Sequence, residues 1–220
     1  MAIVAALNEE EGIGLTIVEL RQYLEKPWIL VVDGKSTDRT VEIAKDLDVD
    51  VAFQKAQGKG DAVAEAIKHV NVDVDFVVFT DADYTYPAEY LPKMIRILEE
   101  NPEIGMVCGN RFNHHLNTKA MRNAFYFGNR LLAFTHNLLN GIAMRDPLTG
   151  LRVIRGEILR EWMPRSKGFD IEVELNHRVE RKGYGIAEVD IGYRPRLGEK
   201  KLKLRHGAAI LKRILLESTF

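Results

Sequence analysis

Residues Phe76–Pro87 read FVVFTDADYTYP, an apolar run followed by two carboxylates and a proline. A short apolar run of this kind predicts a buried strand, and the proline prevents the strand from continuing. Asp81 and Asp83 then stand at the carboxyl end of the strand, where open α/β sheets bind their ligands. Carboxylates at that place are suited to a hard divalent cation that carries phosphates. The stretch therefore predicts a site for Mg²⁺ or Mn²⁺ with a nucleotide diphosphate.

Two other interpretations compete with this one. An isolated Asp-x-Asp after a strand can be an ordinary solvated turn. The series Asp81, Asp83 and Thr85 also matches the Asp-x-Asp-x-Thr nucleophile motif of phosphatases. That chemistry needs a further acidic pair and a lysine downstream, and no Gly-Asp-x-x-x-Asp element follows here. The phosphatase interpretation is therefore disfavoured.

The composition limits the class of protein. A chain of 220 residues with 46% hydrophobic content can form one domain with a real core, or one domain with an appendage. The net charge of −1 indicates no overall preference for nucleic acid or for a membrane. Cys108 is the one cysteine, which excludes an internal disulfide and suits a reducing compartment.

Neither a targeting signal nor a membrane span is expected. The apolar run at residues 1–7 is short and is followed at once by acidic residues. No segment approaches the roughly 20 apolar residues that a spanning helix needs. The sequence therefore predicts a soluble or peripheral protein of the cytoplasm.

Strand and helix patterns alternate through the first half of the chain. The alternation predicts a mostly parallel, Rossmann-like sheet with right-handed crossovers and flanking helices, an α/β fold. The expected strands are 3–7, 28–32, 49–53, 76–80 and 105–108, and the expected helices are 9–24, 40–47, 59–70 and 87–100.

The pattern changes after residue 110. We expect a long helix at 121–139, a strand at 150–155, a helix at 171–182 and a strand at 185–193. The segment from Arg194 to Arg213 is basic, with eight Lys or Arg against one Glu. No linker divides the chain, so residues 1–220 are predicted to form one domain with a helical, basic C-terminal part.

Other polar residues also lie near ends of the predicted strands. Asn8, Glu9 and Asp33 can accept hydrogen bonds from a base or ribose. Lys59, between two glycines, and Arg111 can neutralise phosphate. Each signal alone is weak, because Asp33 could be a helix cap and Gly-Lys-Gly a plain turn. Their joint placement at one edge of a sheet predicts a common site.

The motifs together resemble the inverting family 2 glycosyltransferases of the GT-A fold. The motifs that carry this resemblance are 5–10, 31–40, 58–60, 81–83 and 109–111. Three later segments narrow the match to enzymes similar to the dolichyl-phosphate hexose (mannose) synthases, and these are 146–152, 168–175 and 193–202. The resemblance spans nearly the whole chain, and its motifs occur in order.

The resemblance implies roles for individual residues. Residues 1–110 would bind the nucleotide sugar, 111–200 the acceptor, and 201–220 would form an amphipathic basic tail. The implied nucleotide-binding residues are Leu7, Asn8, Glu9, Asp33, Lys59, Asp81 and Ala82. The implied catalytic residues are Asp81, Asp83 and Arg111. The implied metal-binding residues are Asp81, Asp83 and Thr85, and relatives often have Gln at the position of Thr85. The residues implied to grip the acceptor phosphate are Arg122, Arg196 and Lys201.

The implied reaction moves a hexose from GDP-mannose, UDP-glucose or UDP-N-acetylglucosamine to dolichyl or polyprenyl phosphate. The acceptor is already anionic, so no general base is needed, and metal and cations offset the repulsion between two polyanions. In-line attack would invert the anomeric carbon. A lipid acceptor implies peripheral contact with the cytoplasmic face of a membrane, directly, through an anchoring subunit or as a homo-oligomer.

The C-terminal tail alternates cationic and apolar residues from Lys201 to Leu216. This composition suits an amphipathic segment on an anionic membrane. The same helix could instead pack on the domain or on another subunit, and the pattern does not separate these cases.

Three other functions remain as alternatives. A glycosyltransferase with a glycan acceptor would not need the cations between Arg196 and Lys201. A sugar nucleotidyltransferase usually opens with a glycine- and arginine-rich loop, which residues 5–14 lack. A non-catalytic nucleotide-binding protein would be favoured only if Asp81 and Asp83 proved dispensable for metal binding.

Overall fold

The computed structural model describes residues 1–112, 124–141, 143–199, 201 and 206–218. The strands are β1 (Ala2–Ala6), β2 (Ile29–Asp33), β3 (Asp50–Phe53), β4 (Phe76–Asp81), β5 (Ile104–Asn110), β6 (Arg152–Arg155) and β7 (Gly185–Asp190). The α-helices are α1 (Ile13–Tyr23), α2 (Thr40–Asp46), α3 (Lys59–Ile67), α4 (Leu91–Glu100), α5 (Ala124–Asn140), α6 (Gly156–Leu159), α7 (Ile171–Arg181) and α8 (His206–Glu217). A short 3₁₀ helix, η1 (Ala88–Tyr90), precedes α4.

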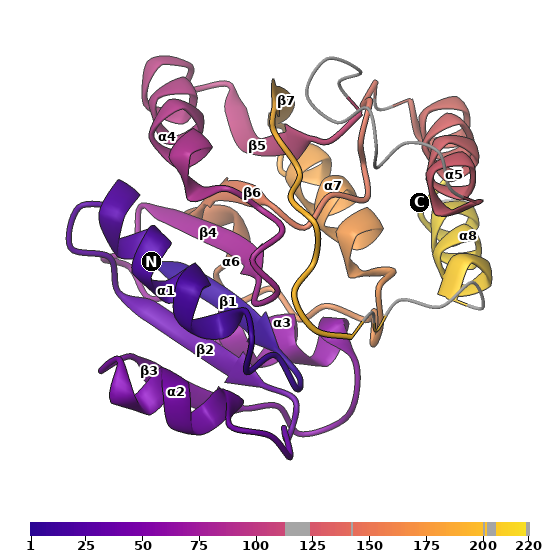
Figure 1. Cartoon of the computed structure of the whole chain (residues 1–220). Coiled ribbons are helices and arrows are strands. Elements are labelled where there is room, and N and C mark those ends of the chain that lie inside the picture. Colours follow the sequence, from indigo (N-terminus) through magenta and orange to yellow (C-terminus); the bar gives the residue numbers. More distant parts are fainter. Residues whose placement is uncertain (113–123, 142, 200, 202–205, 219–220) are drawn as a thin grey trace.

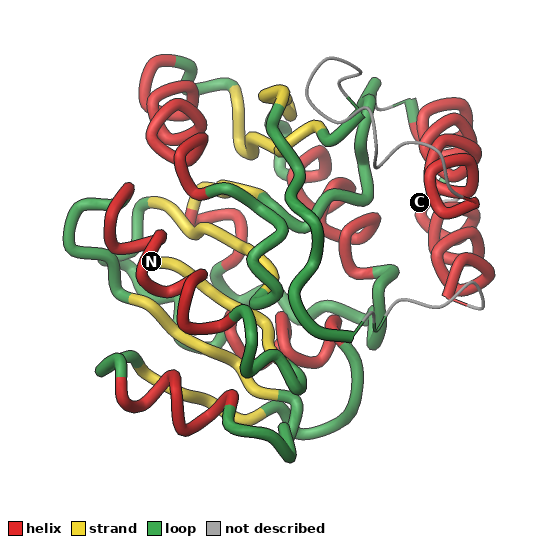
Figure 2. Tube along the Cα trace, viewed as in Figure 1, coloured by secondary structure: helices red, strands yellow, loops and turns green. Residues whose placement is uncertain are grey.

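The strands form one sheet in the order β3-β2-β1-β4-β6-β5-β7. All neighbouring pairs are parallel except those of β6, which runs antiparallel to both β4 and β5. The expected α/β fold with a mostly parallel sheet and flanking helices is confirmed (Figures 1 and 2). The reversed strand lies between two strands that end at the site, so the turn that leads into β6 is brought beside their carboxyl ends.

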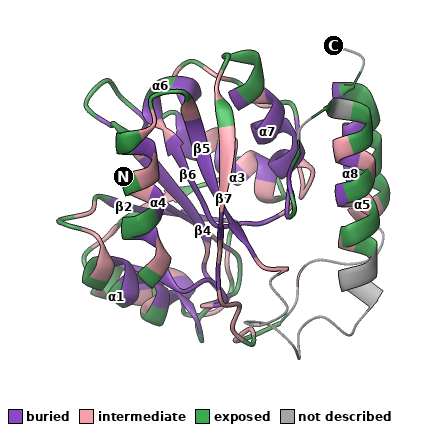
Figure 3. Cartoon of the chain, turned by 90° about the horizontal axis from the view of Figure 1, so that it is seen from above, coloured by how far each residue is buried: buried purple, intermediate pink, exposed green. Residues whose placement is uncertain are grey.

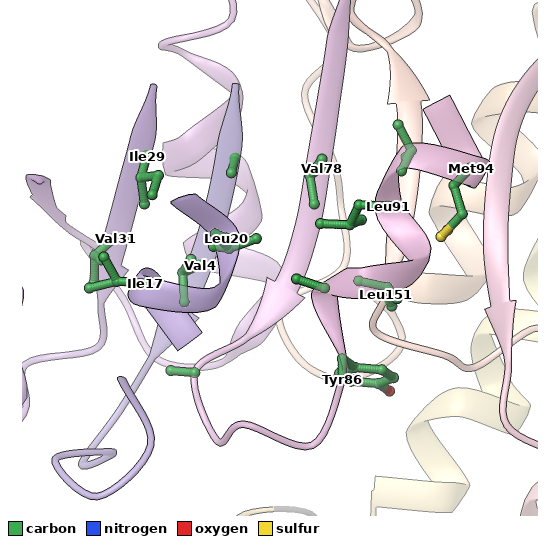
Figure 4. Packing of buried hydrophobic residues seen from close by; sticks show 14 of the residues in the cluster. Val4, Ile17, Leu20, Ile29, Val31, Val78, Tyr86, Leu91, Met94 and Leu151 are labelled. Atoms are coloured by element: carbon green, nitrogen blue, oxygen red, sulfur yellow. The ribbon is translucent and has the colours of Figure 1, made fainter. Parts of the chain in front are cut away.

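Helices cover both faces of the sheet because the buried strands are apolar on both sides. On one face Ile17 and Leu20 of α1 and Leu91 and Met94 of η1–α4 pack on Val78 and its neighbours (Figure 4). The other face packs against α3, α6 and α7. Cys108 is buried in this second cluster, as its sequence neighbours predict.

Two of the differences between predicted and observed limits of elements concern the site. The helix expected from residue 9 begins at Ile13, and the backbone N–H of Glu9 donates to Thr40 Oγ1 at the start of α2. Residues 8–12 therefore form a loop beside β2. The strand expected to reach residue 193 ends at Asp190, opposite Asn110, the last residue of β5.

Helices α5 and α8 pack side by side at the margin of the molecule, away from the sheet (Figures 1 and 3). Ile210 and Ile214 of α8 are buried against Val173 of α7, with Leu132 of α5 packed against the same cluster. The tail therefore packs on the domain through one face. The first residues of the helix expected at 121–139 lie outside the described residues.

A buried histidine pair lies where α5 meets α7. The rings of His136 and His177 are 5.7 Å apart. Burial, followed by the nearby His136 and Arg181, lowers the pKa of His177 to about 4 from its ordinary 6.5. Its Nε2 is buried and has no hydrogen-bond partner among the described residues. Protonation of His177 is therefore unfavourable in the folded chain.

This histidine predicts acid sensitivity. The unfolded chain protonates His177 near pH 6.5 and the folded chain only near pH 4, so the contribution of His177 to the free energy of unfolding should fall as the pH drops through that window. His177→Gln should make the fall shallower. Urea unfolding midpoints of the wild type and the variant at pH 7 and about 4.5 test this. A fall as steep in the variant as in the wild type would contradict it.

Candidate functional site

The carboxyl ends of the central strands meet at one edge of the sheet. The register pairs Ala6 of β1 with Asp33 of β2, and Ala5 with Asp81 of β4. Parallel strands present their carboxyl ends at the same edge, so the loops after β1, β2 and β4 share one site.

Asp83 is the more buried of the two aspartates in the motif. Its Oδ1 accepts hydrogen bonds from the Thr85 N–H (3.1 Å) and hydroxyl (2.6 Å), and its Oδ2 pairs with Arg196 (2.7 Å). Burial and then the charge of Asp81 raise the pKa of Asp83. Thr85 is fully buried and orients this carboxylate, whereas its predicted role toward a metal stays a prediction. Ala82 is buried between the two aspartates.

Lys59 links Asp81 to α7. Its Nζ lies 2.6 Å from Asp81 Oδ1 and 2.9 Å from Glu172 Oε1. Burial alone would lower the pKa of Lys59, but the two carboxylates outweigh it and raise the pKa. A Cβ at Gly60 would lie 2.3 Å from the Ser166 carbonyl oxygen, so glycine lets α3 begin against that loop. Lys59 is thereby held as a buried cation beside Asp81.

Arg111 is held by a carboxylate from the turn before β6. Its Nε and Nη2 donate to Asp146 Oδ2 (2.7 Å) and Oδ1 (2.8 Å), and Nη1 donates to the Tyr86 hydroxyl (3.2 Å). This is a bidentate, geometrically fixed pair. Burial by itself would lower the pKa of Arg111, but Asp146 outweighs it and keeps the pKa above its ordinary value. The role of Arg111 toward a donor stays a prediction.

The same turn touches the aspartate motif. The Gly150 N–H donates to the Tyr86 hydroxyl at 2.8 Å. A Cβ at Gly150 would lie 2.7 Å from Asp81 Oδ2. Arg152 is 1% exposed. It donates hydrogen bonds to the carbonyl oxygens of Pro147 (2.7 Å) and Thr149 (2.9 Å) and so holds the turn in place.

The predicted base and ribose residues lie in the loops after β1 and β2. Leu7 is 40% exposed and Asn8 accepts a hydrogen bond from the Thr37 N–H (2.8 Å). Both carboxylate oxygens of Asp33 accept hydrogen bonds from Ser36, so Asp33 shapes the turn after β2. The predictions of nucleotide contact for these residues remain predictions.

Glu9 faces two of the cations that were predicted to bind the acceptor phosphate, Arg196 and Lys201. Its Oε1 pairs with Arg196 and lies 3.8 Å from Lys201 Nζ, while its Oε2 is buried without a hydrogen-bond partner among the described residues. Burial raises the pKa of Glu9 to about 7, against the opposing charges of Arg196 and Lys201. Glu9 was predicted to contact the nucleotide, and in this structure it joins the cation cluster.

Residues 192–199, which we call the arm, cross the site after β7. The arm brings Arg196 onto Asp83, and Lys201 beyond it donates to the Asn8 carbonyl oxygen (3.0 Å). A pocket of ≈ 310 Å³ opens between the arm and the β1 and β2 loops. It is lined by Asn8, Glu9, Glu10, Glu11, Thr37, Asp38, Gly198, Glu199 and Lys201. Arg122, the third predicted acceptor cation, lies outside the described residues.

The chemistry of Asp81 and Asp83 fits a divalent cation. Each carboxylate has a cationic side chain against it, Lys59 on Asp81 and Arg196 on Asp83, so positive charge already stands at both. The described residues hold no cluster of three or more metal-ligating side chains. A cation here would therefore need phosphate oxygens or water as its remaining ligands, which is usual for Mg²⁺ bound with a nucleotide.

Three residues of this site are not among those to which the resemblance implied a role. Asp146 and Tyr86 position Arg111, and Glu172 shares Lys59 with Asp81. Asp146 and Glu172 fall within the segments 146–152 and 168–175, which carry the resemblance, and that was the available signal. Nothing local to Tyr86 predicted a hydroxyl shared between two distant segments.

Comparison with known proteins places the chain in a family. The family described as Glycosyl transferase family 2 matches residues 1–163. A dolichyl-phosphate hexose transferase of Haloferax volcanii is 36% identical over 217 residues, covering 97% of this chain and 91% of that protein. An undecaprenyl-phosphate mannosyltransferase of Micrococcus luteus is 29% identical, covering 92% of this chain and 86% of that protein.

Solved structures show the same fold. A complex of glucosyl-3-phosphoglycerate synthase from Mycobacterium tuberculosis with uridine diphosphate has a TM-score of 0.78 at 22% identity, covering 100% of this chain and 79% of that one. A structure of the same enzyme with Mn²⁺, UDP-glucose and phosphoglyceric acid gives the same TM-score, identity and coverage. The likeness confirms the expected GT-A-like architecture.

Proposed function

The chain belongs to glycosyl transferase family 2 and is a glycosyltransferase, and from this premise we propose that it transfers a hexose from a nucleotide sugar to dolichyl or another polyprenyl phosphate. The reaction is metal-dependent and inverts the anomeric carbon. Relatives that cover most of the chain carry the names of lipid-phosphate sugar transferases, which supports this acceptor class.

One contact carries the proposal. Arg196 Nη1 lies 2.7 Å from Asp83 Oδ2. The carboxylate proposed for the donor's metal and a cation proposed for the acceptor phosphate are thus adjacent. Transfer between two polyanions requires such adjacency, because the reacting centres must meet while their repulsion is neutralised.

The donor side is assigned to residues 1–110. Asp81 and Asp83 would hold Mg²⁺ or Mn²⁺, which supplies positive charge to the diphosphate as it leaves with its electron pair. Lys59 adds a second cation at Asp81, and Arg111 is held ready for the diphosphate or the sugar by Asp146. The loops that carry Asn8 and Asp33 border the place for base and ribose.

The acceptor side is assigned to residues 111–200 and to Lys201, which follows them directly. Arg196 and Lys201, with Arg122, would bind the lipid phosphate. A phosphate oxygen is already anionic at neutral pH, so it attacks the anomeric carbon without a general base. The chain's own contribution is to position two anions and to neutralise their charge.

A transfer assay tests the proposal. The purified chain is incubated with dolichyl phosphate, Mn²⁺ or Mg²⁺, and labelled GDP-mannose, UDP-glucose or UDP-N-acetylglucosamine in turn. Label that enters the organic phase with one donor supports the function and identifies the sugar. Label that reaches only water or a soluble glycan would overturn the lipid-phosphate acceptor, and full activity without metal would overturn the metal.

The proposal includes peripheral contact with the cytoplasmic face of a membrane through α5 and α8. No helix among the described residues is long and apolar enough to span a bilayer. Leu131, Phe134 and Leu138, which share one face of α5, are 66%, 64% and 68% exposed. Leu211 and Leu215 are exposed on α8, which lies beside α5 (Figure 3). These exposed apolar side chains lie on helices that also carry cationic residues, a combination that fits an anionic lipid surface.

This surface predicts lipid binding. Replacing Leu131, Phe134 and Leu138 together by Ser should weaken binding to vesicles of anionic phospholipid by about tenfold or more, because the apolar area that enters the interface is lost. Co-sedimentation with vesicles measures it. Val72→Ser and Met163→Ser are matched controls, since both side chains are at least as exposed on other segments. Equal vesicle binding by the triple variant and the wild type would contradict the membrane assignment. So would a wild-type chain that is dimeric in solution and becomes monomeric in the triple variant.

A further inference from the structure

The arm is fastened along the aspartate motif by its backbone. The Arg194 N–H donates to the Thr85 carbonyl oxygen (3.0 Å), and the Leu197 N–H donates to the Asp83 carbonyl oxygen (3.2 Å). The Arg194 guanidinium forms a bidentate pair with Glu19 (2.6 and 2.8 Å). These contacts join segments more than a hundred positions apart in sequence. They hold Arg196 against the buried carboxylate of Asp83.

Arg196 is the cation shared by two buried carboxylates. One guanidinium nitrogen pairs with Asp83 and another with Glu9, whose side chains are 5% and 7% exposed. Buried carboxylates need a cationic partner, because an unpaired charge away from water is costly. Asp81 adds a further negative charge next to Asp83. Arg196 supplies that positive charge in the ligand-free chain.

The pairing is incomplete, however. Glu9 Oε2 and Arg196 Nε are both buried and have no hydrogen-bond partner among the described residues. The arrangement therefore neutralises charge without satisfying every polar atom, and leaving such atoms unsatisfied has a free-energy cost. Furthermore, neither Asp81 nor Asp83 lines the ≈ 310 Å³ pocket, whose lining includes Gly198 and Glu199 of the arm.

We propose that Arg196 is an internal counter-ion of Asp83 that a divalent cation replaces, so that metal binding releases the guanidinium toward an incoming phosphate. The proposal rests on the metal assignment made for the proposed function. It adds that the same arginine serves in turn as counter-ion of the donor site and as ligand of the acceptor. It also implies an order, in which metal and donor bind before the acceptor phosphate finds Arg196 available.

The exchange makes the two sites thermodynamically coupled. If metal at Asp83 displaces Arg196, then removing the arginine's charge must strengthen metal binding by the same free energy with which Arg196 opposes it. Coupling between sites in proteins is usually about 5- to 150-fold in affinity. If Arg196 only supported the fold of the metal site, its removal would instead weaken metal binding.

The direct test measures Mn²⁺ binding without donor or acceptor. Free Mn²⁺ is followed by electron paramagnetic resonance at pH 8, above the pKa of about 7 for Glu9. Arg196→Met removes the charge and keeps the length, and should bind Mn²⁺ at least about fivefold more tightly than the wild type. Arg196→Lys keeps the charge and should stay within about twofold of the wild type. Arg96→Met, on an exposed position of α4, controls for the same change in net charge and should not differ.

A second measurement follows the arm itself. In the wild type, Mn²⁺ should accelerate hydrogen exchange at the amides of Arg194 and Leu197, because these donate to the aspartate motif while the arm is docked. Amides of the core strands should not change. This readout reports release of the arm and does not depend on catalysis.

The outcomes separate the exchange from the function on which it rests. Equal or weaker Mn²⁺ binding by Arg196→Met, in chains that bind the ion and remain folded, would overturn the exchange and leave the glycosyltransferase assignment intact. Absence of Mn²⁺ binding in every variant would overturn the metal assignment and the exchange together. Tighter Mn²⁺ binding by Arg196→Met, together with amide hydrogen exchange at Arg194 and Leu197 that Mn²⁺ does not change in the wild type, would overturn release of the arm.

Discussion

Asp83→Asn should lower kcat/KM for hexose transfer by at least about 10²–10³-fold, the range found when one preorganised charge-stabilising group is removed. The amide keeps the shape of the side chain and can still accept the hydrogen bonds from Thr85. It removes the negative charge that would attract the divalent cation, and it leaves Arg196 with one carboxylate partner instead of two. The loss should therefore be in metal and donor use, with the fold retained.

Steady-state rates over a series of Mn²⁺ concentrations, together with circular dichroism, check this expectation. Asp73→Asn is the matched control. Asp73 is exposed and precedes the amino end of β4, away from the site, so this variant should behave as the wild type. A variant at Asp83 that keeps wild-type activity would remove the aspartate from the mechanism. A variant that recovers full activity at high Mn²⁺ would restrict its role to metal affinity.

Gly150→Ala should lower kcat/KM about 100-fold while changing stability little. A Cβ at this position would lie 2.7 Å from Asp81 Oδ2, closer than real Cβ atoms approach other atoms, and 3.1 Å from the Tyr86 ring, which is tighter than most Cβ contacts. The Asp81 side chain is partly exposed and can move away, so the cost falls on the geometry of the site. A displacement of about 1 Å in a reacting group can cost a factor of about 100 in rate.

Gly128→Ala provides the comparison, because a Cβ there would meet nothing within 4 Å. Thermal unfolding and initial rates of both variants would be measured side by side. Wild-type activity in Gly150→Ala would show that the turn before β6 does not hold Asp81 in its working position. A large loss of stability would place the effect in folding instead.

Local patterns in the chain were enough to predict the strands and helices of residues 1–110. The apolar run of β4 ends at Asp81, as its composition and the later proline indicate, and the strand ends carry the polar residues expected there. Those features depend on neighbours within a few residues. The start of α1 was predicted four residues early, because the local pattern does not show that residues 8–12 form a loop with distant contacts, such as that of the Glu9 N–H with Thr40, 31 positions away.

The fold class and the aspartate motif follow from local patterns, because periodicity and turn residues are encoded by neighbouring residues, and the order of the motifs along the chain indicates the family. The partners of each charge depend on how distant segments fold together. Lys59 meets Glu172 and Arg111 meets Asp146 because the sheet and α7 bring them together, at distances of 2.9 and 2.7 Å. Arg196 meets Asp83 from 113 positions away, because the arm returns across the carboxyl ends of the strands. Electrostatic attraction acts through space. The sequence therefore shows which charged residues the site contains, whereas the fold determines which of them form ion pairs.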